Sequence, residues 1–506
     1  MTGKEASQTV AGRLARYCRE LSYRHFPEEV VHEVKRRLID TFACALGGWK
    51  SVPARIAREV AGRVRLRSGA TILGSGQKTT ADLAAFANGT AVRFLDYNDT
   101  YLSKEPAHPS DNIAVALAAA EVAERGGQGL IEAIVLGYEI QCRLCDAASL
   151  RPKGWDHVTY GAFSTALVAA KLWRLTETKT VHALGLAGTP NNALRQTRVG
   201  ELSMWKAAAF ANAGRNGLFA AELARLGMTG PAPIFEGEKG FMKTVSGLLS
   251  LPPLDPKGPF KILETYIKYY PVEYHAQSAV QAALILRGQI CEDQAPPVRA
   301  WGAGASEKRR QSRASHGPPH TVDKGRHAIK SVTVRTPDVS YEIIGRDPEK
   351  WRPKTRETAD HSLPYCVAAA LMDGVVGLRQ FGARRIADPK LHALIQQVLV
   401  VSDPELSAAY PAAIANIVEV KTVEKVYTER VDYPKGHPKN PMTDAEVEEK
   451  FRRLAVPLIP EREVGKILEQ LWNLEKVKSI GALLALFKWN AVNFRLRTYF
   501  KMKGKP

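Results

Sequence analysis

Residues 94–112, with the sequence FLDYNDTYLSKEPAHPSDN, gather side chains that transfer protons or bind oxyanions between two alanine-rich segments. These side chains are Asp96, Asp99, Thr100, His108 and Asp111. A helix is predicted immediately afterwards, over residues 113–125, with Asp111 or Asn112 as its N-cap. Unpaired backbone N–H groups and the helix dipole at such a helix start favour a bound carboxylate. The stretch therefore indicates acid/base chemistry on a carboxylate.

Other titratable or cationic side chains stand at predicted helix starts. Lys206 falls in the first turn of the helix that follows LRQTRVGELS, and His275 opens the helix HAQSAVQAALIL. His157, in KGWDHVTYGAF, precedes another helix. A single histidine before a helix is more often a capping or packing residue than a catalyst. The repeated arrangement favours a helical enzyme with a pocket for a multiply charged acid.

The motifs of several cofactor and nucleophile classes are missing from the sequence. It contains no H-E-x-x-H, Walker loop, G-x-S-x-G, or G-x-G-x-x-G after a strand. Of the six cysteines, only Cys142 and Cys145 form a C-x-x-C, inside a helical pattern. Because a structural zinc or an iron–sulfur cluster needs three or four such ligands, we expect neither a metal site nor another cofactor.

Length and composition indicate an ordinary globular protein. At 506 residues, two domains or one large domain with an insertion are expected. Hydrophobic residues make up 45% and charged residues 24% of the chain. No apolar run reaches the roughly 18 to 20 residues of a membrane span, so no membrane partner is expected. Charged residues interrupt the N-terminal segment where a signal peptide would be apolar, which favours a cytoplasmic location.

The net charge of +19 raises the question of a nucleic-acid partner. Lysine and arginine are spread along the chain, with local excess mainly at residues 307–320 and 488–506. Neither segment has a zinc-finger, helix-turn-helix or aromatic RNA-binding signature, so no nucleic-acid partner is expected. The charge could instead attract small polyanionic substrates.

Hydrophobic periodicity predicts a mainly α fold with a large all-helical domain and a smaller α+β domain. The helical domain comprises residues 1–270, and helical periodicity returns over 436–487. Between them, residues 271–435 form the α+β domain. In SVTVRT (331–336) and in residues 417–433, polar and β-branched residues alternate, which predicts strands. Residues 360–379 and 391–401 are predicted to be helical. Residues 292–327 are predicted to be a flexible basic insertion, and 488–506 a basic tail.

Seven segments in order along most of the chain resemble the MmgE/PrpD family. They are LDYNDTYLSKEPAHPSDN, KGWDHVTYGAFSTALVAAKL, LRQTRVGELSMWKAAAFANAGRNG, MTGPAPIFEGEKGF, YYPVEYHAQSAVQAAL, VSYEIIGRDPEKWRPKTRETADHSLPY and HPKNPMTDAEVEEKF. Within the family, FEGEKGF and ETADHSLPY look like the 2-methylcitrate dehydratase branch rather than the decarboxylase branch. The resemblance implies a helical domain with an α+β lid, a homodimer, an active site at the domain junction, and no iron–sulfur cluster.

The resemblance also implies an activity and a set of site residues. The activity is dehydration of 2-methylcitrate to 2-methyl-cis-aconitate in propionate catabolism, with citrate and isocitrate as further candidate substrates, so the expected partner is a small tricarboxylic acid. The residues that match the family's pocket are Asp96, Thr100, His108, His157, Lys206, His275 and, from the lid, Tyr341.

Roles follow from the chemistry of the reaction, which removes a carbon-bound proton and expels hydroxide. Histidine titrates near neutrality, so His108 and His157 are the expected acid/base pair, with Asp96 orienting or charging one of them. Which histidine removes the proton stays open. Cations are expected to stabilise the charge that develops on the substrate. The candidates for these cations are Lys206 and His275, with Arg195 and Arg198 as secondary clamps on the substrate carboxylates. Tyr341 is expected to seal the pocket or to relay a proton. His361 is a further candidate, for which a helix-capping role is at least as well supported.

Two alternatives to the dehydratase remain at this point. One is a cis-aconitate decarboxylase or an epimerase on the same scaffold. The other is a non-catalytic relative whose basic segments bind polyanions, which salt-dependent binding to nucleic acid would support.

Overall fold

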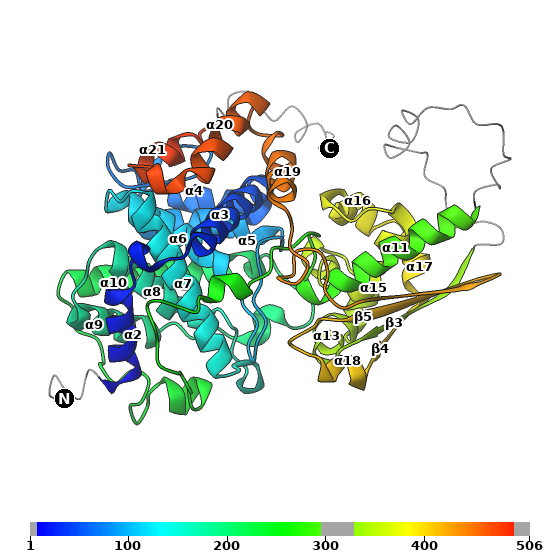
Figure 1. The fold of residues 1–506 in the computed structure, drawn as a ribbon, viewed down its shortest axis with the longest axis horizontal. Helices are drawn as coiled ribbons and strands as arrows, with labels where there is room; N and C mark the ends of the chain where they lie inside the picture. Colours follow the sequence, from blue (N-terminus) through cyan, green and yellow to red (C-terminus); the bar gives the residue numbers. More distant parts are fainter. Residues whose placement is uncertain (1–7, 295–327, 490–506) are drawn as a thin grey trace, which may run out of the picture. The chain divides into compact units, whose positions relative to one another are not determined.

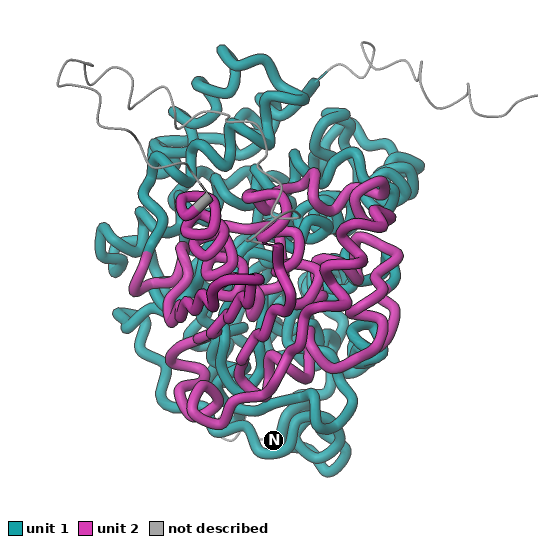
Figure 2. Tube along the Cα trace, turned by 90° about the vertical axis from the view of Figure 1, so that its right-hand side faces the viewer, with its two compact units in different colours: residues 1–199, 203–267, 441–506 teal, residues 200–202, 268–440 magenta. Residues whose placement is uncertain are grey.

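The computed structural model describes residues 8–294 and 328–489 (Figure 1). It divides into two compact units, of which the first comprises residues 1–199, 203–267 and 441–506, and the second 200–202 and 268–440 (Figure 2). Most described residues are helical, which confirms the predicted fold class. Nearly all of the predicted insertion and tail lies outside the described residues. The predicted domain limits stay a prediction, because a division into compact units does not test independent folding.

The first unit is a helical bundle with one small hairpin. Its helices from the N-terminal part of the chain are α2 (Val10–Glu20), α3 (Glu28–Gly48), α4 (Val52–Ala61), α5 (Ala81–Phe94), α6 (Asn112–Val122), α7 (Gly127–Ala147), α8 (Thr159–Leu172), α9 (Glu177–Gly188) and α10 (Trp205–Arg225). The hairpin pairs β1 (Ala70–Thr71) with β2 (Lys78–Thr79). Almost every side chain of α6 and α8 is buried, so these two helices form the centre of the unit.

Small residues let the central helices approach closely. A Cβ added to Gly217 of α10 would lie 2.1 Å from the Oγ1 of Thr165 on α8 and 2.5 Å from the carbonyl oxygen of Ala162. Such contacts explain why alanine and glycine are frequent in α8 and α10. Because α8 and α10 approach so closely, the position of α10, including Lys206 in its first turn, is set relative to α8 and to the residues before α8, which include His157.

The C-terminal helices belong to the same unit as the N-terminal ones. They are α19 (Asp444–Ala455), α20 (Glu461–Trp472) and α21 (Ile480–Ala485). A capping box between Thr443 and Glu446 starts α19. The ammonium of buried Lys450 on α19 then contacts Asp40 of α3 at 2.6 Å and donates to the carbonyl oxygen of Tyr97 at 2.7 Å. This buried ion pair and hydrogen bond hold α19 against α3 and against the 94–112 stretch.

The second unit contains a four-stranded sheet in the order β4-β3-β5-β6. Its strands are β3 (Ile329–Thr336), β4 (Val398–Ser402), β5 (Asn416–Thr422) and β6 (Val426–Val431). β3 pairs with β4 in parallel and with β5 antiparallel, so that Val332 lies between Val398 and Val420. The prediction of a helix over residues 391–401 is therefore wrong in its second half. Helix α17 (Pro389–Ile395) ends at Ile395, and the valine run that follows forms β4 and pairs with β3.

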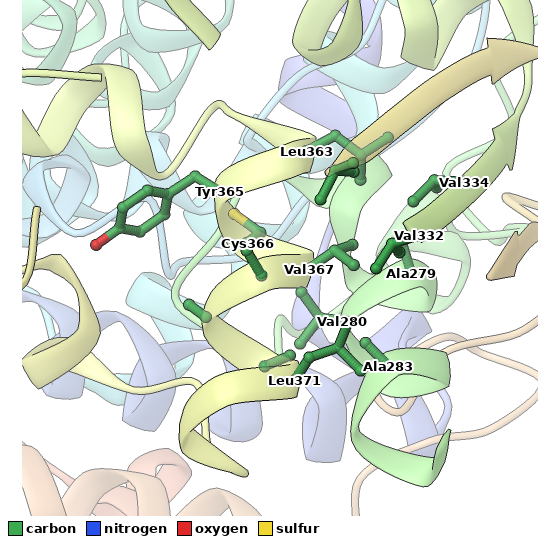
Figure 3. Packing of buried hydrophobic residues seen from close by; sticks show 14 of the residues in the cluster. Ala279, Val280, Ala283, Val332, Val334, Leu363, Tyr365, Cys366, Val367 and Leu371 are labelled. Carbon is green, nitrogen blue, oxygen red and sulfur yellow. The ribbon is translucent and has the colours of Figure 1, made fainter. Parts of the chain in front are cut away.

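Two helices supply the largest shares of the apolar core of the second unit. α11 (Gln277–Gln294) and α15 (Leu363–Asp373) pack together on the sheet, α11 against β5 and β6 and α15 against β4. Figure 3 shows Leu371 of α15 close to Val280 and Ala283 of α11. The shorter helices are α13 (Asp338–Ser340), α14 (Arg356–Ala359), α16 (Ala383–Ile386) and α18 (Pro404–Ala408). Among the helices of the described chain, none has both the length and the apolar character needed to cross a membrane.

Candidate active site

The 94–112 stretch connects α5 to α6 through a buried, constrained loop. Asp96 has a φ of 49°, a left-handed conformation that side chains other than glycine seldom adopt. Paired backbone hydrogen bonds join Thr100 to Tyr266 and Tyr101 to Ala107. The second pair folds the loop back on itself, which returns His108 to a position beside Thr100.

The side chain of His108 is held at both ring nitrogens. Nδ1 lies 2.7 Å from the carbonyl oxygen of Asp99 and 3.2 Å from the Oγ1 of Thr100. Nε2 lies 2.7 Å from the Nη2 of Arg93. Because a guanidinium only donates hydrogen bonds, Nε2 must accept here, and the ring proton is on Nδ1. His108 is therefore neutral in this structure.

Asp96 lies between two buried cations. One carboxylate oxygen is 2.5 Å from the Nη1 of Arg93, and the other is 3.2 Å from the Nζ of Lys206. Lys206 is in the first turn of α10, where the sequence places it, and only 2% of its surface is exposed. Since a buried charge is tolerated when it is paired, Asp96 keeps both cations inside the protein. Arg93 thus connects Asp96 to His108.

The start of α6 differs from the prediction in one respect. Asp111 takes the N-cap position, but within the described chain its carboxylate makes no capping hydrogen bond. It accepts instead from the Nδ2 of Asn98 at 2.8 Å and lies 3.8 Å from the Nε of Arg93. Burial raises the pKa of Asp111 to about 7, against the opposing effect of Arg93. Helix α6 ends at Val122, three residues before the predicted end.

His157 precedes α8 and faces a carboxylate. Its Nδ1 lies 2.9 Å from the Oδ1 of Asp156, whose other oxygen is 2.9 Å from the Nε of Arg198. Nε2 of His157 is buried and has no hydrogen-bond partner among the described residues. The rings of His108 and His157 lie 5.7 Å apart between centroids. The two histidines that the sequence singles out as a pair are therefore neighbours.

Burial and charge act in opposite directions on this dyad. Burial lowers the pKa of His157, and Asp156 partly offsets this effect. Burial would raise the pKa of Asp156, but Arg198 and His157 outweigh it and hold this pKa far below its usual range. At neutral pH the dyad is thus a neutral imidazole beside a carboxylate, the arrangement that suits a general base.

The two candidate arginine clamps occupy different positions in the short helix η4 (Arg195–Arg198). Arg198 contacts Asp156, so its guanidinium supports the dyad. The backbone N–H of Arg195 donates to the carbonyl oxygen of Gly154 at 2.8 Å, and burial lowers the pKa of its guanidinium. A role for either arginine in binding a substrate stays a prediction.

The remaining candidates, His275, Tyr341 and His361, belong to the second unit. Nδ1 of His275 lies 2.9 Å from Glu273, while its buried Nε2 has no hydrogen-bond partner in the described ranges. Burial would raise the pKa of Glu273, but His275 and its other cationic neighbours lower it to about 2. Tyr341 starts the short helix η9 (Tyr341–Gly345) and is partly exposed. That these side chains meet His108 and His157 stays a prediction.

The sequence analysis missed the partners of the histidines. Arg93 lies three residues before Asp96 on α5, and Asp156 directly precedes His157. Nδ1 of His361 likewise lies 2.8 Å from the preceding Asp360, and Glu273 precedes His275 by two residues. A carboxylate one or two residues before a histidine is the sequence signal that could have found three of these pairs.

Family comparisons agree with the segments quoted from the sequence. The MmgE/PrpD N-terminal domain matches residues 12–251, and the MmgE/PrpD C-terminal domain matches residues 311–474. The chain belongs to the MmgE/PrpD family. This membership confirms the resemblance and covers every candidate residue except His275, which lies between the two matched ranges.

Named relatives of this MmgE/PrpD protein are enzymes with small-molecule substrates. The 2-methylcitrate dehydratase of Cupriavidus necator is 28% identical over 424 residues, which cover 79% of this chain and 80% of that enzyme. The 2-methylcitrate dehydratase of Escherichia coli K12 is 26% identical and covers 85% of this chain and 87% of its own. Human cis-aconitate decarboxylase is also 26% identical, with coverage of 92% and 91%. The MmgE/PrpD family thus includes both dehydratases and decarboxylases.

Proposed function

We propose that this protein is a cofactor-independent hydro-lyase that dehydrates 2-methylcitrate to 2-methyl-cis-aconitate, with citrate and isocitrate as further substrates. The observation that carries the proposal is the pair of neighbouring histidines, buried His157 and partly buried His108, whose ring centroids lie 5.7 Å apart beside the buried cations Arg93 and Lys206. Dehydration of a tricarboxylate needs a base, an acid and fixed positive charge, and this cluster contains all three types of group.

His157 is the proposed base. Its Nε2 carries a lone pair with no partner among the described residues, and Asp156 stabilises the imidazolium that forms when it takes a proton. In the reaction, the carbon-bound proton moves to Nε2 of His157, and the electron pair of the C–H bond forms the new double bond. The C–O bond on the neighbouring carbon breaks, and the hydroxyl group leaves as water once it has received a proton.

The cationic side of the cluster is proposed to receive the substrate carboxylates and the departing hydroxyl group. Lys206 presents an amine donor that contacts Asp96, and Arg93 presents a planar fork that matches a carboxylate. His108 is the proposed acid, which requires that its Nε2 gain a proton. In the second unit, His275 and Tyr341 are proposed to complete the pocket. A homodimer, a cytoplasmic location and a place in propionate breakdown are part of the same proposal.

The test is product analysis with 2-methylcitrate, citrate, isocitrate and cis-aconitate. Formation of the conjugated double bond from 2-methylcitrate, followed by its ultraviolet absorbance, is the expected result. Release of carbon dioxide from cis-aconitate would instead assign the decarboxylase activity that the human relative's name describes. Turnover of none of the four, with salt-dependent binding to nucleic acid, would favour the non-catalytic alternative.

Substitution tests the site itself. His108→Ala and Lys206→Ala should each abolish dehydration while the circular dichroism spectrum stays close to that of the wild type. The matched control is His32→Ala, because His32 also contacts a carboxylate, that of Asp444, but is 41% exposed in its side chain. Wild-type turnover in either test variant would remove that residue from the mechanism.

A further inference from the structure

Arg93 touches three members of the candidate site with three different nitrogens. Nη1 contacts Asp96 at 2.5 Å, Nη2 contacts Nε2 of His108 at 2.7 Å, and Nε lies 3.8 Å from Asp111. Arg93 is 2% exposed and comes from the last turn of α5. Two carboxylates thus hold the guanidinium of Arg93 in place. The same guanidinium donates a hydrogen bond to Nε2 of His108, the nitrogen from which His108 would deliver a proton as an acid.

The contact between Arg93 and His108 has a chemical consequence. Arginine stays protonated in proteins and cannot accept a hydrogen bond, so Nε2 of His108 can hold no proton while Nη2 donates to it. A second positive charge at Nε2 would also repel the guanidinium at this distance. His108 can therefore act as an acid only after Arg93 has turned to another acceptor.

A substrate carboxylate is the natural competitor for the guanidinium. It offers two acceptor oxygens in the geometry that an arginine fork prefers, whereas His108 offers one neutral lone pair. We propose that Arg93 is a positioning residue that keeps His108 neutral in the unliganded protein and releases it for protonation when an anionic substrate takes over the guanidinium. This inference rests on the proposed function, because it assigns His108 the acid role in that reaction.

Other charged groups around His108 bear on its protonation. Asp96, which contacts Arg93, also forms an ion pair with Lys206, and the ring centroid of His157 lies 5.7 Å from that of His108. Asp111 could also take up a proton when a ligand binds, because burial raises its pKa to about 7 and it lies 3.8 Å from the same guanidinium. The experiment must therefore separate proton uptake by His108 from proton uptake by Asp111.

The first measurement needs no ligand. Nuclear magnetic resonance of the full-length protein with ¹⁵N-labelled histidine, assigned by His108→Gln, reports which ring nitrogen carries the proton. The wild type should show a neutral, Nδ1-protonated His108 down to about pH 5.5, and Arg93→Gln should restore a titration near the ordinary value of about 6.5. An Nε2-protonated ring, or a wild-type titration near the ordinary value, would overturn the proposal. The wild-type spectrum decides this even if Arg93→Gln fails to fold.

The second measurement uses tricarballylate, a tricarboxylate without a hydroxyl group to eliminate. Calorimetric titration in buffers of different ionisation enthalpy should show uptake of about one proton on binding near pH 6.5 in the wild type. Arg93→Gln should take up about half as much, because a His108 with the ordinary pKa is already about half protonated at that pH before the ligand binds. Asp111→Asn should retain the uptake. Binding without proton uptake in the wild type, or loss of the uptake in Asp111→Asn, would overturn the proposal.

Kinetic measurements complete the test, and they distinguish a failure of the Arg93 proposal from a failure of the proposed function. Arg93→Gln should lower kcat for dehydration by roughly tenfold to a hundredfold, and Arg93→Lys, which keeps the charge, should recover part of the loss. The matched control Arg58→Gln removes a half-buried arginine that donates to the carbonyl oxygen of Trp49, and it should leave kcat unchanged. If no tricarboxylate is turned over, the proposed function fails, whereas the ligand-free spectrum still decides whether Arg93 holds His108.

Discussion

His108 and His157 are neighbours in the same helical unit, yet their surroundings are opposite in charge. At Nδ1, His108 faces a backbone carbonyl oxygen and His157 faces the carboxylate of Asp156. At Nε2, His108 meets a guanidinium, whereas His157 has no hydrogen-bond partner within the described chain. The comparison shows that residue type alone does not distinguish the proposed acid from the proposed base. Their immediate partners do.

The His157 arrangement recurs in the second unit, where Glu273 and Asp360 contact the Nδ1 atoms of His275 and His361. A carboxylate at Nδ1 fixes the tautomer of a histidine and stabilises its protonated form. His108 is the exception among the four candidate histidines. Its contact with Arg93 is therefore the feature that most needs a functional explanation.

The largest effect should come from removing the proposed base. His157→Gln keeps the size and polarity of the side chain but cannot take a proton, so we expect kcat for 2-methylcitrate dehydration to fall by roughly a thousandfold. Steady-state kinetics with the melting temperature as a control would measure this. A loss of less than tenfold would mean that the asymmetry between the two histidines does not reflect their roles.

A smaller loss is expected when the carboxylate of the dyad is removed. Asp156→Asn should lower kcat by about a hundredfold, because the imidazolium form of His157 loses its partner. Asp156 raises the pKa of His157, so its removal should also move the acidic limb of the kcat/KM profile to lower pH. A limb that stays in place would show that another group controls it.

Arg198→Gln should have the opposite effect on the same profile. Arg198 lowers the pKa of His157, so its loss should move the acidic limb to higher pH while kcat falls by only about tenfold. The pH dependence of kcat/KM measured side by side for both variants provides the check. Shifts of the two variants in the same direction would contradict the electrostatic account of the dyad.

The smallest effect concerns stability on the His108 side. Burial raises the pKa of Asp111 above its value in the unfolded chain, so protonated Asp111 favours the folded state, and this contribution is lost as the pH rises through about 7. Asp111→Asn removes the penalty above that pH, worth no more than about 4 kcal/mol. The melting temperature of the variant should exceed that of the wild type at about pH 8, and the gain should shrink towards about pH 4. A gain independent of pH would contradict the assignment.

Much of the fold could be predicted because its signals are local. The periodicity of the segments that form α3, α8 and α10 predicts helices, and the alternation in SVTVRT predicts the strand β3. The valine run of β4 was predicted as helix because a short apolar segment fits either structure until a neighbouring strand is known. Only the pairing with β3 decides it.

The sequence by itself determined the family, the mainly helical architecture and the types of group available for chemistry, including the placement of Lys206 in a first helical turn. The tertiary structure decided which groups meet. Arg93 and His108 are 15 residues apart, and Asp156 and Arg198 are 42 apart. Local patterns specify elements because side chains a turn apart share a face. Contacts across such separations depend on how helices pack and loops return, and these contacts give two identical imidazoles different surroundings.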